Sequence, residues 1–100
     1  MAVKLLMNWD ILPGREQEYF EFIVRDFIPK LQKLGLEPSD AWLTMYGNQP
    51  QIATEVQMNS LADLKSILQS TEWQELIASL MEFVANYRHK IVPARTGFQM

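Results

Sequence analysis

Few side chains in this sequence have the chemistry of acid–base catalysis. The only histidine, His89, lies in the run Tyr87-Arg88-His89-Lys90, where a helix is predicted to end. Histidine titrates near neutral pH, so His89 could act as a general base. We favour a structural interpretation, because Arg88, His89 and Lys90 would complement the dipole at the C-terminal turn of that helix.

Asn8 and Glu55 are two further candidates. Asn8 could hydrogen-bond a substrate oxygen, or it could meet a partner strand or water at an interface. Asp10 lies on the same side of the predicted first strand, and we expect it to end that strand. If Glu55 were desolvated against aromatic side chains, it would hold a proton more readily and could act as an acid or base. The alternative, which we favour, is an ion pair between Glu55 and Lys4 or Arg95.

A mixed aromatic and polar surface is expected where the predicted strands 41–47 and 51–58 pair. Its members are Trp42, Thr44, Tyr46, Glu55 and Gln57. Ligand pockets combine apolar walls with a few convergent polar groups, so this surface, together with Asn8, is a candidate site for a small organic molecule. The alternative is that the same surface is an interface.

The composition excludes several kinds of site. The chain has 100 residues and no cysteine, which excludes disulfides, thiolate nucleophiles and cysteine-ligated metals. With a single histidine per chain, we predict no metal site and no cofactor. Nine Lys and Arg against twelve Asp and Glu give a net charge of −3 without a basic block, which argues against a nucleic-acid partner. No serine or threonine has a neighbouring His–Asp arrangement, and Pro13-Gly14 is a single turn rather than a phosphate-binding loop.

The chain is expected to form one domain, 1–100, that is soluble and by default cytoplasmic. No stretch approaches the roughly 18 uncharged apolar residues that cross a membrane. The short apolar start ends at Asn8 and Asp10 without a cleavage site, so no signal peptide is predicted.

The first predicted strand, 2–11, alternates between two faces because strand side chains have a period of two. One face carries Val3, Leu5, Met7, Trp9 and Ile11, and the other carries Lys4, Leu6, Asn8 and Asp10. A helix is predicted over 14–34, because the apolar period changes there to 3.6. Its stripe is Phe20, Ile23, Val24, Phe27, Ile28, Leu31 and Leu34. Pro29 cannot bond the Arg25 carbonyl, so a kink is expected within 25–29.

The second half of the chain begins with Gly35 as the C-terminal cap of that helix and a loop over 35–40. Two helix starts then follow the strand pair: a capping box at Ser60-Leu61-Ala62-Asp63, and a better one at Thr71-Glu72-Trp73-Gln74 that opens a longer helix. The apolar stripe of the longer helix is Trp73, Leu76, Ile77, Leu80, Met81, Val84 and Tyr87. A last strand is predicted over 92–99. Trp9 and Trp73 could shape a cavity, but we expect them in the core, with Met7, Met45, Met58 and Met81 as gap-fillers.

The element order β-α-β-β-α-β is that of an α+β, ferredoxin-like fold, an antiparallel sheet with helices on one face and a split second helix. The helices would cover the face of Val3, Leu5, Met7 and Trp9, leaving Leu6, Trp42 and Tyr46 on the open face. Because exposed aromatic patches usually need covering, we expect a homodimer through this face.

The sequence resembles the dimeric α+β barrel superfamily, whose members include NIPSNAP-type proteins and antibiotic-biosynthesis monooxygenases. The similarity rests on Pro13-Gly14 after the first strand, the glutamate-rich helix start, and the segment Ser70-Thr71-Glu72-Trp73-Gln74-Glu75-Leu76. It implies a barrel of two facing sheets with a ligand cavity between sheet and helices. It also implies, for Asn8, the role of a substrate hydrogen-bonding asparagine in cofactor-free oxygenases.

The haem-degrading branch of the superfamily is not supported. That branch requires an asparagine on the first strand, which Asn8 could supply, and a tryptophan and a histidine on the second helical segment. Ile67 and Ile77 stand at the two latter positions, and Trp73 and His89 are too far along the chain to replace them.

Two functions follow from the sequence. The first is a small-molecule-binding protein, extending to a cofactor-independent monooxygenase or isomerase, that uses the sheet–helix cavity with Asn8, Trp42, Tyr46 and Glu55. The second is a non-catalytic dimeric module in which the polar sheet face is an interface. Fold alone does not decide between them.

Overall fold

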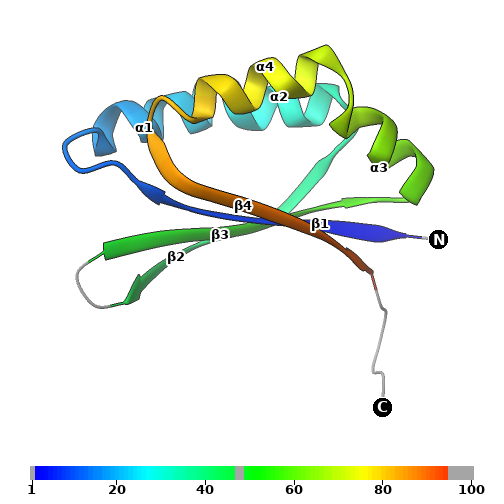
Figure 1. Cartoon of the computed structure of the whole chain (residues 1–100), viewed down its shortest axis with the longest axis horizontal. Helices are drawn as coiled ribbons and strands as arrows, with labels where there is room; N and C mark the ends of the chain where they lie inside the picture. The colour runs from blue at the N-terminus through cyan, green and yellow to red at the C-terminus, as the bar shows by residue number, and fades with distance from the viewer. Residues whose placement is uncertain (1, 47–48, 95–100) are drawn as a thin grey trace.

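The described strands form one antiparallel sheet, and the helices pack on one of its faces (Figure 1). The computed structural model describes residues 2–46 and 49–94, with 39–46 and 49–51 described by their backbone alone. The strands are β1 (Val3–Ile11), β2 (Glu37–Tyr46), β3 (Gln49–Met58) and β4 (Val84–Pro93), in the order β2-β3-β1-β4. The helical segments are α1 (Glu16–Phe22), η1 (Ile23–Phe27), α2 (Ile28–Lys33), α3 (Leu61–Leu68) and α4 (Thr71–Leu80). The predicted α+β, ferredoxin-like fold is confirmed.

Strand β1 lies in the middle of the sheet and shows the predicted alternation. Val3, Leu5, Met7, Trp9 and Ile11 are buried under the helices, whereas Asn8 on the opposite face is exposed. On the neighbouring strand β3, Ile52, Thr54 and Val56 are likewise buried. This period-two pattern fixes which face of the sheet carries the core, because a slip of one residue would turn every apolar side chain to the other side.

The long helical segment 16–33 is interrupted where Pro29 predicts a disturbance. Over η1 the chain makes a π-helical turn, in which the Ile28 amide donates to the Ile23 carbonyl five residues back. Proline has no amide hydrogen, so the bond from residue 29 to Arg25 is missing, and a single wide turn accommodates the defect. The disturbance is a π-helical turn over Ile23–Phe27, which overlaps the range 25–29 in which a kink was expected.

The apolar stripe predicted for this segment is partly wrong. Tyr19, Phe27 and Leu31 face the core, whereas Phe20 and Val24 are 47% and 69% exposed. The π turn adds a residue to the helical repeat, which changes the face presented before and after it.

Gly35 ends the segment as predicted, with φ of 91°. The Gly35 amide donates to the Gln32 carbonyl at 3.0 Å and the Leu36 amide to the Leu31 carbonyl at 2.9 Å. This is the Schellman arrangement, and it buries Leu36 completely. The predicted loop over 35–40 is wrong, because β2 already begins at Glu37. β2 tolerates Pro38 as an edge strand.

The second helical segment is split as predicted, with one difference at its caps. Ser60 Oγ accepts from the Asp63 amide, as the first capping box predicts. The cap of α4 is Ser70, whose Oγ accepts from the Trp73 amide at 3.2 Å. The predicted cap Thr71 is instead the first helical residue.

The end of α4 and the start of β4 are where the sequence prediction is most wrong. The helix was expected to continue to Tyr87, and the last strand to cover 92–99. Instead α4 ends at Leu80, and β4 runs from Val84 to Pro93, while 95–100 lie outside the described residues. Met81, expected in the core, follows the helix end and is 47% exposed.

A β-bulge explains this error. Asn8 pairs with Arg88 and Asp10 with Ala85, so β4 has one extra residue opposite Trp9. Asn86 in this bulge has φ of 59°. The extra residue leaves Val84 and Tyr87 on the same face at a spacing of three, which imitates a helical period.

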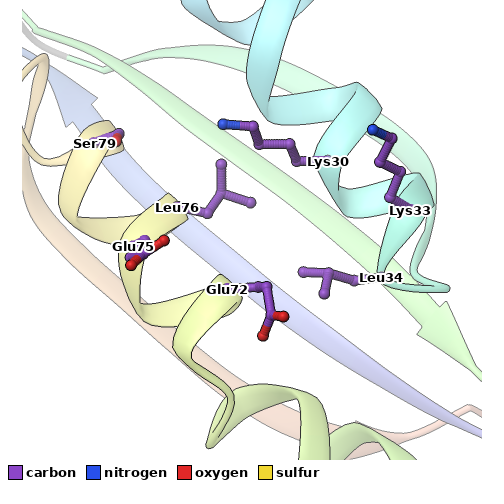
Figure 2. A pocket seen from close by; sticks show the side chains of 7 residues that line it. All are labelled: Lys30, Lys33, Leu34, Glu72, Glu75, Leu76 and Ser79. Atoms are coloured by element: carbon purple, nitrogen blue, oxygen red, sulfur yellow. The ribbon is translucent and has the colours of Figure 1, made fainter.

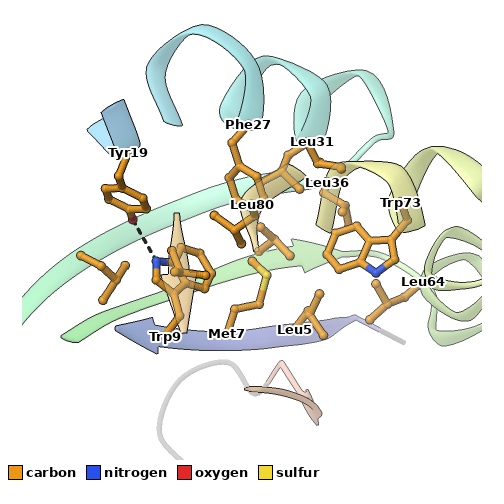
Figure 3. Close-up of a cluster of buried hydrophobic side chains, with 14 of the residues drawn as sticks. Leu5, Met7, Trp9, Tyr19, Phe27, Leu31, Leu36, Leu64, Trp73 and Leu80 are labelled. Carbon is orange, nitrogen blue, oxygen red and sulfur yellow. Dashed lines mark hydrogen bonds between the residues drawn. The ribbon is translucent and has the colours of Figure 1, made fainter. Parts of the chain in front are cut away.

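The core fills the space between the sheet and the helices (Figure 3). Trp9 and Trp73 both lie in it, 2% and 4% exposed, which confirms their expected core position. Leu5, Leu64 and Leu80 have no exposed surface and lie along the centre of the core.

Candidate functional site

An apolar cleft of about 300 Å³ lies between the sheet and the first helical segment. Its floor comes from β1 and β3, its roof from α1, η1 and α2, and one edge from β2. The described residues that line it are Trp9, Tyr19, Ile23, Phe27, Ile28, Leu31, Gln32, Pro38, Ile52 and Thr54. No residue in this described set carries a formal charge.

Tyr19 and Trp9 hold one wall of the cleft in a fixed geometry. The indole Nε1–H of Trp9 donates to the Tyr19 hydroxyl at 3.0 Å, and both residues are 2% exposed (Figure 3). The Trp9 ring is stacked against Tyr87 at 5.9 Å between centroids, and Phe27 meets it edge-on at 5.8 Å. Two rings and a hydrogen bond therefore restrict the Trp9 side chain.

Burial raises the pKa of the Tyr19 phenol to about 12, even though the hydrogen bond from Trp9 opposes the shift. Burial also raises the pKa of Tyr87 well above its usual value. Both phenols therefore stay protonated at neutral pH, and each can act as a hydrogen-bond donor.

His89 lies on strand β4 rather than at a helix C-terminus, so the interpretation based on a helix dipole is wrong. Its Nδ1 lies 3.0 Å from the Tyr87 hydroxyl, and the imidazole is exposed. The His89 ring packs edge-on against Tyr87, which in turn stacks on Trp9. His89 is absent from the described lining of the cleft.

Asn8 and Glu55 lie on the open face of the sheet. They line a shallow hollow of about 560 Å³, whose described lining also includes Leu6, Arg88, His89 and Lys90. Glu55 Oε1 lies 3.0 Å from Lys4 Nζ, which is the ion pair expected from the sequence. The structure thus groups Asn8, Glu55 and His89 around this hollow, and it separates all three from the sheet–helix cleft.

The other predicted members of that surface are only partly described. Gln57 is exposed and pairs with Lys4 in the strand register. The register places Trp42 opposite Ala53 and Tyr46 opposite Gln49, and the side chains of Trp42 and Tyr46 lie outside the described residues. Arg95, the alternative partner for Glu55, also lies outside them.

A groove of about 350 Å³ between α2 and α4 was not predicted. Figure 2 shows Lys30 and Lys33 on one wall and Glu72 and Glu75 on the other. Only the approach of α4 to α2 brings the two charged rows together. The groove is charged, in contrast to the cleft beneath α1.

In the described ranges 2–46 and 49–94, no group of three or more His, Cys, Asp or Glu residues could hold a metal ion. No helix in these ranges is long and apolar enough to cross a membrane.

Comparison with known proteins identifies the fold. No protein-family model matches the sequence, and no curated protein matches it. The structure is similar to a NIPSNAP family protein from Agrobacterium tumefaciens, with a TM-score of 0.74 and 19% identity over 98% of this chain and 96% of that chain. An uncharacterised NIPSNAP-like domain protein from Burkholderia xenovorans gives 0.72 and 16% identity, over 99% and 90%.

A protein from Nitrosomonas europaea that is proposed to be an antibiotic biosynthesis monooxygenase is also similar. Its TM-score is 0.70 at 7% identity, over 98% of this chain and 94% of that chain. The chain therefore has the ferredoxin-like fold that NIPSNAP proteins and monooxygenases of this type share, as its sequence resemblance implies. At these identities the similarity concerns the fold alone, so activity must be argued from the cleft.

Proposed function

We propose that this protein binds a small organic molecule in the cleft between the sheet and the α1–η1–α2 segment. The observation that carries the proposal is a preformed hollow of about 300 Å³ with apolar walls and few polar atoms, at the lower end of the size range of ligand pockets. The aromatic wall is held by the Trp9–Tyr19 hydrogen bond, so a ligand would meet an ordered surface.

The proposal extends to cofactor-independent monooxygenation or isomerisation of the bound molecule. Support comes from the fold shared with the proposed monooxygenases of Nitrosomonas europaea and Chloroflexus aurantiacus. In such a monooxygenation the substrate itself would reduce dioxygen, with one oxygen atom entering the product and the other leaving as water. The protein would contribute orientation and exclusion of bulk water.

The binding step is tested with Nile red, a neutral apolar dye, in the full chain. We expect saturable binding that Ile23→Phe weakens, because the larger side chain fills the cleft. Val24→Phe is the matched control, because Val24 is the next residue on the helix and is 69% exposed. Equal binding by the two variants would show that the dye occupies another surface and would contradict the proposal.

A second copy of the chain is the occupant that we propose for the open sheet face. In the described part of the chain no helix covers this face (Figure 1). Half-buried Leu6 lies there among polar groups. Non-catalytic association through this face is therefore the second candidate function. We expect sedimentation at micromolar concentration to give a dimer that Leu6→Glu dissociates, whereas Gln17→Glu on α1 leaves it intact. A wild-type monomer of 11.7 kDa would refute the dimer.

Native mass spectrometry separates the two functions. A retained small molecule supports the binding function, and its extraction gives its identity. A dimer that never retains or takes up a small molecule supports the interface function alone.

A further inference from the structure

The Tyr19 hydroxyl has an unused donor at the wall of the cleft. An indole nitrogen only donates, so in the 3.0 Å contact Tyr19 Oη must be the acceptor from Trp9. The Tyr19 proton therefore points elsewhere. Among the described residues, Trp9 is the only hydrogen-bond partner of this hydroxyl. Because Tyr19 lines the cleft, a molecule held there is placed to accept that proton in place of water.

The surroundings of this donor select against charge. None of the described residues that line the cleft is Lys, Arg, His, Asp or Glu. A carboxylate, phosphate or ammonium group would therefore lose its hydration without gaining an ion pair, which is unfavourable. A neutral molecule with a single acceptor atom has no such cost.

The remaining walls suit a flat apolar body. Trp9 and Phe27 meet edge to face at 5.8 Å, and the isoleucines of η1 and β3 lie on the other sides. Burial keeps the phenol of Tyr19 protonated, since its pKa is raised to about 12. At neutral pH it therefore donates to an acceptor.

We propose that Tyr19 orients the ligand by donating its O–H to a neutral carbonyl oxygen, and that the cleft selects uncharged, apolar carbonyl compounds. This inference rests on the proposed function, since it names the ligand class of the same cleft. Trp9 acts as a positioning residue, because its N–H fixes the direction in which the Tyr19 proton points.

Three probes of one shape test the inference: 2-acetonaphthone, a neutral ketone; 2-ethylnaphthalene, which lacks the oxygen; and 2-naphthoate, which is anionic. For the wild type we expect the ketone to bind about tenfold more tightly than the hydrocarbon, as one hydrogen bond in an apolar site allows. We expect the anion to bind more weakly than both. Tyr19→Phe should remove the tenfold preference while leaving the affinity for the hydrocarbon unchanged.

Tyr87→Phe is the matched control, because it removes a phenol that also contacts Trp9 but is absent from the described lining. The infrared stretching frequency of the carbonyl group in the bound ketone reports the hydrogen bond directly. In the wild type this frequency should lie below its value in hexane, and in Tyr19→Phe it should return towards that value.

The possible failures are distinguishable. If neither neutral probe binds, the proposed function fails. If both bind equally and the carbonyl stretch is that in hexane, the cleft binds ligands but the inference about Tyr19 is refuted. If the anion binds best, the selection against charge is refuted. Should Tyr19→Phe not fold, the wild-type selectivity and carbonyl stretch still decide the question.

Discussion

The bulge in β4 gives the most specific stability prediction, because one residue combines an unusual backbone angle with a side-chain hydrogen bond. Asn86 has φ of 59°, and its Nδ2 donates to Asp10 Oδ2 at 2.9 Å. Left-handed backbone is accessible to glycine, tolerated by asparagine and unfavourable for other residues. Replacing Asn86 by Gly therefore removes the hydrogen bond alone, whereas replacing it by Ala removes the hydrogen bond and adds backbone strain.

The expected magnitudes follow from these two contributions. Loss of the hydrogen bond lowers the free energy of unfolding by about 1 kcal/mol. Left-handed strain in alanine adds at least about 1 kcal/mol. We expect Asn86→Ala to cost about 2 kcal/mol in total and Asn86→Gly about half of that. In a chain of 100 residues, 1 kcal/mol corresponds to a Tm change of about 4–5 °C.

Urea unfolding followed by circular dichroism measures these differences at constant m-value. A double-mutant cycle is completed by two more variants, Asp10→Ala and the double variant Asp10→Ala/Asn86→Ala. Its coupling energy isolates the contribution of the hydrogen bond. Equal losses for Asn86→Gly and Asn86→Ala would refute the argument from backbone strain. A coupling energy of zero would show that the bond to Asp10 adds nothing to stability.

Three further predictions follow from the caps, the core and the buried phenol. Ser70→Ala should lower the free energy of unfolding by about 1 kcal/mol in urea titrations, while Thr71→Ala changes it by much less, because Ser70 caps α4. Leu64→Ala should cost between about 2 and 5 kcal/mol, and Leu61→Ala, at a position 41% exposed, should cost less than about 1 kcal/mol in the same assay. The Tyr19 phenol has a pKa of about 12 in the folded state and about 10 in the unfolded state. Its contribution to the free energy of unfolding is therefore complete below pH 10, and above pH 10 it falls by up to about 1.4 kcal/mol per pH unit. Unfolding at pH 9 to 11 should therefore show a steeper loss for the wild type than for Tyr19→Phe, and parallel curves would contradict the burial of this phenol.

The parts of the fold that local chemistry controls could be predicted from the sequence. Alternation in 2–11 gave the buried face of β1, because a strand in the middle of a sheet has only two faces. Gly35 predicted a helix end, because the Schellman turn needs a positive φ. Pro29 predicted a kink in the first helix, because proline removes a specific hydrogen bond, and the structure has a π-helical turn at Ile23–Phe27.

Other parts depended on contacts distant in sequence. The boundary between α4 and β4 was wrong because the bulge at Asn86 changes the strand period to a helix-like spacing between Val84 and Tyr87. The open face was predicted with Asn8 and Glu55 together, because both positions follow from strand alternation. Its separation from the ligand cleft required knowing which face the helices cover.

Tyr19 was missed as a site residue because the predicted helix stripe was chosen from apolar types, so the neighbouring Phe20 was taken instead. Their exposures are the reverse of that assignment, 2% for Tyr19 and 47% for Phe20. A buried tryptophan N–H requires an acceptor, and Trp9 lies on the buried face of β1. That requirement is the signal in the sequence that favours a tyrosine over a phenylalanine on the facing helix.

The bulge in β4 and the ligand cleft lie on opposite sides of Trp9, and contacts through Trp9 connect them. The extra residue at Asn86 brings Tyr87 onto the face that stacks against the Trp9 ring, and Trp9 in turn directs the Tyr19 hydroxyl. Without the extra residue, position 87 would face the open side of the sheet. Trp9 would then lose its stacking contact with the Tyr87 ring on β4. The orientation of the Tyr19 proton in the cleft therefore depends on the register of an edge strand. For this reason we expect deletion of Asn86, in a chain that still folds, to weaken the preference for the ketone over the hydrocarbon, whereas Asn86→Gly keeps the bulge and the preference.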